Sequence, residues 1–159
     1  MVNRAMRSLG IDYGRRRIGL ALSDPTGLLA RPWKAIARVG TPAEVAGTLA
    51  SEIAALAADD DGLGTVIVGL PRRLSGEDSE QTKHVEALVA RLRPLVRVPI
   101  VTQDERLSSR EAESLLARRE KDWRKRKPLI DATAAAVILQ DYLDGQARSA
   151  PVDAEGEVT

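Results

Sequence analysis

The sequence contains no cysteine and only one histidine, so disulfides and thiolate metal sites are excluded. A metal site would have to be built mainly from oxygen ligands, which favours Mg²⁺ or Mn²⁺ over zinc. Aromatic residues make up 3% of the chain and phenylalanine is absent, which argues against an extended platform for stacking nucleobases. Carboxylates are therefore the side chains most able to carry chemistry.

Charge and hydropathy do not select a partner. The 24 Lys and Arg residues nearly balance the 23 Asp and Glu residues, so only a local cluster of cations could attract an anionic ligand. No apolar run approaches the roughly 20 residues of a membrane span, and the N-terminal MVNRAMR lacks the apolar region of a signal peptide. We therefore expect a cytoplasmic enzyme or binding protein with no membrane partner.

The chain of 159 residues is long enough for one domain with a substantial core. We expect a flexible leader over residues 1–6, a single domain over 7–144 and a disordered tail over 145–159, where the sequence is small and polar.

The first third of the domain predicts an antiparallel meander of three strands. An apolar run from Ser8 to about Tyr13 is followed by the turn GRRR and by RIGLALSD, in which apolar residues alternate with small ones. A weaker third strand is predicted through LLARPWKAI, where Pro32 marks an edge or a bulge.

The rest of the domain predicts helices that alternate with buried strands. Thr41 and Glu44 form a capping box before one helix, and apolar spacing predicts a second helix that ends before Pro94. TVIVGLP and VPIVTQ are continuous apolar runs typical of parallel strands covered on both faces. The predicted fold is α/β, with a mixed five-stranded sheet, a three-strand meander plus βα units, and helices on both faces.

Two further helices are predicted towards the C-terminus. Ser108 and Glu111 form a second capping box, and the last helix is predicted from about Leu129 to Leu143. Between them, the charged segment RREKDWRKRKP ends in proline and predicts a mobile loop.

Three acidic residues lie within or directly after apolar stretches: Asp12 in LGIDYG, Glu105 in VTQDERL and Asp131 in PLIDATAAAVIL. A carboxylate in such a setting loses hydration and needs a partner or a proton. One shared divalent cation would satisfy all three. Simpler roles also exist, since Asp12 could shape the turn that follows it and Asp131 could be an ordinary acid at a helix N-terminus.

The predicted last helix places Asp131 on one face with Ala135, Ile138 and Tyr142. Small residues on that face would let the helix approach the sheet closely. Asp104 and Glu105 follow a buried strand and point in opposite directions if extended. We assign Glu105 to the cleft and Asp104 to a supporting or turn-forming role.

Three carboxylates without a histidine or cysteine partner fit two-metal phosphodiester hydrolysis, with Asp12 on the central strand as the bridging ligand. Four motifs, in this order, also resemble the YqgF/RuvX family of bacterial RNase H-like nucleases: LGIDYG with RIGLALSD, VIVGLPRRLSG, TQDERLSSREA and LIDATAAAVILQ. The resemblance covers roughly residues 8–143.

The resemblance implies an RNase H-like fold and a nuclease that processes the 5′ end of pre-16S ribosomal RNA, with kinship to Holliday-junction resolvases. It places the family's acidic positions on Asp12, Glu105 and Asp131, which would bind Mg²⁺ or Mn²⁺, with two ions expected when substrate is bound. The family's GLP motif falls on residues 69–71, followed by Arg72, Arg73 and Gly76. One departure is Lys127-Pro128, where the family usually has Lys-Gly.

Cations cluster beside these motifs, so a positive rim could hold phosphates around the acidic site. We predict a nucleic-acid-binding set made of Arg15, Arg16, Arg17, Arg72, Arg73, Trp123, Arg124, Lys125, Arg126 and Lys127. Trp123 could stack on an unpaired base or anchor its loop, and Arg106 could contact the scissile phosphate or pair with Asp104. His84 is predicted to be a surface residue.

The predicted function is therefore metal-dependent cleavage of structured RNA. Alternatives are a resolvase acting on branched DNA, a non-catalytic nucleic-acid-binding regulator and, because GIDYG resembles a phosphate loop, an actin-like phosphotransferase. A homodimer remains an open alternative to a monomer.

Overall fold

The computed structural model describes residues 6–71, 79–105 and 123–149. Five strands form one mixed sheet in the order β3-β2-β1-β4-β5. β1 pairs antiparallel with β2 and parallel with β4, so it lies at the centre. The strands are β1 (Arg7–Tyr13), β2 (Arg17–Ser23), β3 (Ala30–Ala37), β4 (Leu63–Pro71) and β5 (Ile100–Glu105). This arrangement confirms the predicted meander followed by parallel strands.

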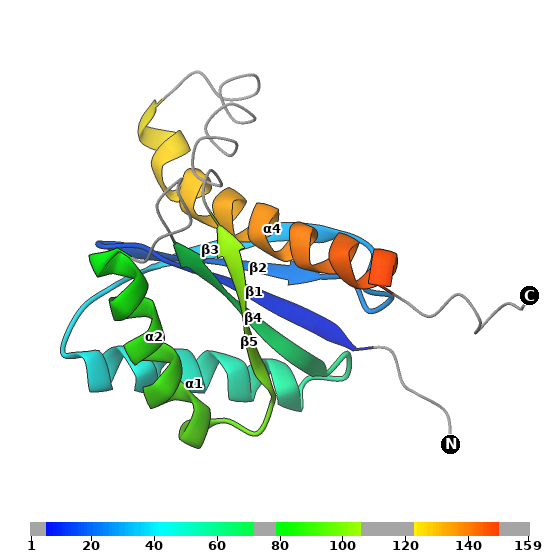
Figure 1. Cartoon of the computed structure of the whole chain (residues 1–159), viewed down its shortest axis with the longest axis horizontal. Coiled ribbons are helices and arrows are strands. Elements are labelled where there is room, and N and C mark those ends of the chain that lie inside the picture. The colour runs from blue at the N-terminus through cyan, green and yellow to red at the C-terminus, as the bar shows by residue number, and fades with distance from the viewer. Residues whose placement is uncertain (1–5, 72–78, 106–122, 150–159) are drawn as a thin grey trace, which may run out of the picture.

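Helices cover both faces of the sheet (Figure 1). α1 (Pro42–Ala58) and α2 (Glu80–Leu92) lie on one face, with the short 3₁₀ helix η1 (Arg93–Leu95) after α2. α4 (Trp123–Ser149) crosses the other face. Within the described ranges, none of these helices has both the length and the apolarity to cross a membrane.

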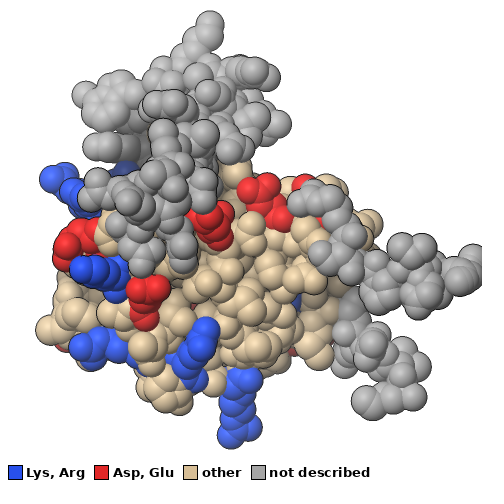
Figure 2. Space-filling model, viewed as in Figure 1, with Lys and Arg blue, Asp and Glu red and all other residues tan. Residues whose placement is uncertain are grey.

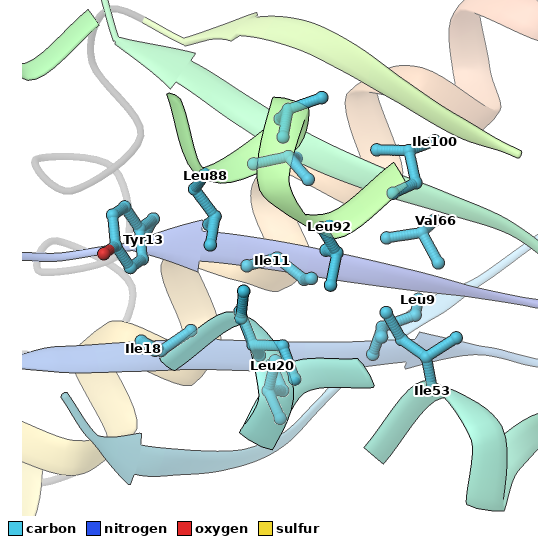
Figure 3. Packing of buried hydrophobic residues seen from close by; sticks show 14 of the residues in the cluster. Leu9, Ile11, Tyr13, Ile18, Leu20, Ile53, Val66, Leu88, Leu92 and Ile100 are labelled. Atoms are coloured by element: carbon cyan, nitrogen blue, oxygen red, sulfur yellow. The ribbon is translucent and has the colours of Figure 1, made fainter. Parts of the chain in front are cut away.

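Because successive side chains of a strand point to opposite faces of the sheet, the buried residues form two clusters. The larger cluster lies between the sheet and α1 and α2, and Figure 3 shows part of it, including Ile11, Leu20, Ile53 and Leu92. The smaller cluster lies under α4 and consists largely of small and β-branched residues: Ala21, Ile67, Ala135, Ala136, Ile138, Leu139 and Leu143. The two faces of the sheet are therefore packed by side chains of different size.

Local signals read from the sequence are confirmed at several element ends. Thr41 caps α1, its side chain accepting from the backbone of Glu44 while the Glu44 carboxylate accepts from the backbone of Thr41. β3 is an edge strand, and its register with β2 shifts at Pro32, which cannot donate to a strand ladder.

The prediction for α4 was wrong at both ends. The helix begins at Trp123 rather than near Leu129, so residues 123–128 are helical and not part of a loop. It continues through Gly145 to Ser149, so the first five residues of the predicted tail are helical as well. The two expected stop signals, Pro128 and Gly145, both lie inside the helix and do not end it. The yellow start of α4 is tilted against its orange remainder in Figure 1, as an interior proline favours.

Other predictions fall outside the described residues. These are the leader over 1–5, the helix opened by Ser108 and the tail over 150–159.

α4 approaches the sheet closely because two strand positions have no side chain. A Cβ on Gly10 would lie 2.8 Å from the Cβ of Leu139 and 2.9 Å from the carbonyl oxygen of Ala135. A Cβ on Gly19 would lie 1.9 Å from the carbonyl oxygen of Asp131. The small helix face predicted from the sequence therefore meets glycines on β1 and β2.

The loop between β2 and β3 is organised by one carboxylate. Oδ1 of Asp24 accepts from the backbone N–H groups of Leu28 (3.0 Å) and Leu29 (2.9 Å), and Oδ2 accepts from the Thr26 hydroxyl. The backbone hydrogen bond from Leu29, followed by that from the Thr26 hydroxyl, lowers the pKa of Asp24 from 3.8 to about 2.

The first testable consequence concerns Gly19. Gly19→Ala should destabilise the fold by about 1–3 kcal/mol or more, because the new methyl group meets backbone atoms that cannot rotate away. Chemical denaturation measures this. Gly47→Ala within α1 is the matched control: a Cβ there meets nothing within 4 Å, so the same substitution should stabilise by about 0.5–1 kcal/mol. An unchanged stability in Gly19→Ala would contradict the close packing.

A second consequence concerns pH. The folded-state pKa of Asp24 is depressed, so its hydrogen bonds contribute stability above about pH 4 that is lost as the pH falls towards 2. The stability difference between wild type and Asp24→Asn should therefore shrink over that window. Denaturation at a series of pH values tests it, and a pH-independent difference would refute the role of the ionised carboxylate.

Candidate active site

Asp12 lies on the central strand and faces α4. Its neighbours Ile11 and Tyr13 belong to the cluster on the opposite face, and Gly10, two residues earlier, touches α4. Its Cα is paired with that of Gly19 on β2. The carboxylate is half-buried, so it lies at the border between the packed helix and solvent.

Asp131 reaches the same point from α4. Its backbone carbonyl is the atom that a Cβ on Gly19 would meet, so Asp12 and Asp131 both adjoin Gly19, one across the strand pair and one above it. The structure thus brings together two predicted site residues that are distant in sequence. Asp131 lies within α4 and not in its first turn, so its predicted interaction with the helix N-terminus is wrong.

The Asp131 carboxylate has a cationic partner in this structure. Nε of Arg17 donates to its Oδ2 over 2.6 Å, and the two side chains are 33% and 23% exposed. Arg17 precedes Gly19 by two residues on β2, so it lies on the same face as Gly19 and Asp12. The sequence predicted that this acid needs a partner or a proton, with a divalent cation as the favoured partner. In the structure its partner is the guanidinium of Arg17.

β5 brings the third predicted acid to the same edge of the sheet. β1, β4 and β5 run parallel, and β5 ends with Asp104 paired to Leu70 and Glu105 paired to Pro71. Asp104 is exposed. Val101 packs in the cluster under α4, and position 105 has the same parity along the strand. The side chain of Glu105 lies outside the described residues.

The predicted basic rim is described only in part. Arg15 and Arg16 are exposed in the turn between β1 and β2, whereas Arg17 is engaged with Asp131. Arg72, Arg73 and Arg106 lie outside the described residues, and residues 123–127 are known only as the first turns of α4. Figure 2 shows Lys and Arg interspersed with Asp and Glu on the visible surface rather than in one continuous patch.

Sequence reasoning missed the pairing of Arg17 with Asp131 and the role of Gly10 and Gly19. A signal was present, since the small residues Gly19, Ala21 and Ser23 alternate with larger ones along RIGLALSD. That pattern indicates a strand face with room for a close backbone. His84, predicted to be a surface residue, has a side chain that is 52% exposed, which confirms that prediction.

The donor set at Gly19 suits a hard cation, because it offers carboxylate oxygens and neither sulfur nor imidazole. Among the described residues, no three His, Asp or Glu side chains gather closely enough to hold a metal ion. Of the three predicted ligands, Asp12 and Asp131 are among these described residues, whereas the side chain of Glu105 is not.

Comparisons with known proteins find relatives that match most of the chain. The family model described as "RuvX: Holliday junction resolvase" matches residues 6–145. A protein of Anaeromyxobacter sp. is 40% identical over 141 residues, covering 89% of this chain and 98% of its own length. A protein of Syntrophus aciditrophicus is 37% identical over 139 residues, covering 87% of this chain and 89% of its own. Both carry the name "Putative pre-16S rRNA nuclease".

Among solved structures, RuvC of Thermus thermophilus superposes with a TM-score of 0.53 at 15% identity, covering 91% of this chain and 98% of that one. That similarity confirms the predicted RNase H-like fold. The family resemblance predicted from the four motifs is also confirmed, because the family model spans nearly all of the described chain. This chain belongs to the RuvX family.

Proposed function

We propose that this protein is a metal-dependent endonuclease that hydrolyses phosphodiester bonds and processes the 5′ end of pre-16S ribosomal RNA. The single observation that carries the proposal is the meeting of Asp12 and Asp131 at Gly19, at the carboxyl end of the central strand. Ligands in open α/β sheets bind at this edge. Relatives covering most of this chain are named for the same activity.

Asp12, Asp131 and Glu105 would hold Mg²⁺ or Mn²⁺, with two ions expected when substrate is bound. The bound cations would activate water and stabilise the leaving oxygen. The chain's own part is to hold the carboxylates in place: β1 positions Asp12, and α4, pressed on Gly19, positions Asp131. Asp104 and Arg106 adjoin Glu105 in sequence and would support it.

Cleavage of branched DNA is the second candidate. The matching family model is described as a Holliday junction resolvase, and a carboxylate site of this kind hydrolyses phosphodiesters without reading bases. Purified protein offered a precursor ribosomal RNA and a four-way DNA junction, each with Mg²⁺ or Mn²⁺, distinguishes the two substrates.

Asp12→Asn should reduce cleavage by about a hundredfold or more, because the amide keeps the shape of the side chain but loses the charge that binds the cation. Its melting temperature should stay close to that of the wild type. Cleavage of labelled RNA in Mg²⁺, together with thermal unfolding, measures both effects. Wild-type cleavage rates in this variant would exclude Asp12 as a catalytic residue and favour a non-catalytic binding role.

The Arg17–Asp131 pair allows a test that does not depend on activity. Arg17→Gln removes the partner of a half-buried carboxylate and should cost about 1 kcal/mol in metal-free solution. If Asp131 also binds the cation, millimolar Mn²⁺ should raise the melting temperature of this variant more than that of the wild type, because Arg17 no longer competes for the carboxylate.

Lys34→Gln is the matched control, since it breaks a comparable pair between Lys34 and Glu52 (3.1 Å) on β3 and α1, on the sheet face opposite α4. It should show a similar loss of stability without an enhanced response to Mn²⁺. Equal responses to Mn²⁺ in wild type and Arg17→Gln would argue against Asp131 as a metal ligand.

A further inference from the structure

A hollow of about 390 Å³ lies beside the turn that follows Asp12, on the sheet face opposite α4. We call it the Arg38 hollow, and its lining residues are Arg15, Arg38, Glu80, Gln81 and His84. They come from the β1–β2 turn, the segment after β3 and the first two turns of α2. The hollow therefore joins three elements at the same end of the sheet as the candidate active site.

Tyr13 links the hollow to the site. It is the residue after Asp12, and its ring lies in the cluster under α1 and α2. Its backbone carbonyl accepts from Nε2 of Gln81 over 2.9 Å. The hollow is thus one residue along β1 from the catalytic carboxylate, on the other side of the strand.

Arg38 is held in place before any ligand binds. Its guanidinium carbon lies 4.0 Å from the centroid of the Tyr13 ring, and its Nη1 donates to the carbonyl of Gly14 over 3.0 Å. Its backbone N–H donates to the carbonyl of Arg16 over 2.9 Å. A guanidinium offers five N–H donors, and fixing it beforehand lowers the entropy lost when an anion binds.

The charges of the hollow favour an anion. Arg15 and Arg38 each bring a guanidinium group, while Glu80 is the one acidic side chain among the described residues that line the hollow. The Glu80 side chain is 81% exposed and lies 4.0 Å from Nε2 of His84. The guanidinium N–H groups of Arg38 that do not donate to Gly14 could bind the oxygens of a phosphate group, whose geometry they match.

We propose that the Arg38 hollow binds a backbone phosphate of the nucleic-acid substrate, on the opposite side of β1 from the carboxylates. The proposal rests on the nuclease function proposed above. A strand held there would be anchored by a contact that carries no sequence information, while the scissile bond lies across the edge of the sheet at Asp12. The hollow is therefore a binding subsite and takes no part in the chemistry.

The test is binding of a fluorescent RNA duplex to Arg15→Gln/Arg38→Gln, measured at several salt concentrations. Affinity should fall roughly tenfold for each arginine, and the slope of log K against log salt should decrease by about one for each. With cleavable RNA the KM should rise while kcat stays within about twofold, because the lost contact is the same in ground and transition states.

Arg31→Gln is the control, because Arg31 is an exposed arginine at the far end of the sheet, paired with Leu22. It should leave affinity and salt slope unchanged, and a loss equal to that of the double variant would reveal a general charge effect and overturn the proposal. Arg38→Gln also removes the contact with Tyr13, so Arg15→Gln alone and Arg38→Lys are measured beside it. Each should weaken binding less than the double variant while keeping the wild-type melting temperature.

A titration with inorganic phosphate alone, monitored through the amide chemical shifts of Gly14 and Gln81, shows whether the hollow binds free phosphate or only the phosphates of an RNA backbone. Chemical-shift changes that saturate would support a site for any phosphate. If no changes occur but the double variant loses RNA affinity, the site is specific for the phosphates of the polymer backbone. If the double variant keeps the RNA affinity and the salt dependence of the wild type, phosphate binding by the Arg38 hollow is wrong, while the nuclease proposal stands. A wild-type protein that binds no RNA would overturn both.

Discussion

The contact between α4 and the two central antiparallel strands leaves no room for side chains at Gly10 and Gly19. Alanines on the facing side of the helix, such as Ala135, complete this close approach. Because backbone meets backbone there, the helix cannot slide without losing contact along its length. The position of Asp131 relative to Asp12 follows from this packing, and the candidate active site depends on it.

Close packing also creates an electrostatic problem. Asp12 is half-buried and the Asp131 side chain is 23% exposed, and a carboxylate that loses hydration needs a compensating partner. Arg17 provides one from the same strand face by donating to Asp131. The pair thus gives the Asp131 carboxylate a cationic partner from within the chain. In the function proposed here, Arg17 and the metal ion would compete for one acid.

At one edge of the sheet, acidic side chains lie on one face and basic side chains on the other. The α4 face presents carboxylates, and the α1–α2 face presents the arginines of the Arg38 hollow. Asp12 and Tyr13, successive residues of β1, point to these opposite faces because side chains alternate along a strand. In the functions proposed above, a nucleic acid that crosses this edge would meet phosphate-binding arginines on one face and hydrolytic carboxylates on the other.

Local sequence determined much of the fold: alternation predicted the strands, the Thr41 box predicted the start of α1, and Pro32 marked the edge strand. It also selected Asp12 and Asp131 as candidate site residues, because a carboxylate beside apolar residues can be recognised without a structure. It failed at the ends of α4, because Pro128 and Gly145 lie inside the helix and local propensity is only a weak predictor of where a helix ends. Only the tertiary structure decided that Arg17 pairs with Asp131 and that Arg38 lies on Tyr13, because both contacts join segments whose register is set by strand pairing and helix packing, not by neighbours in the chain.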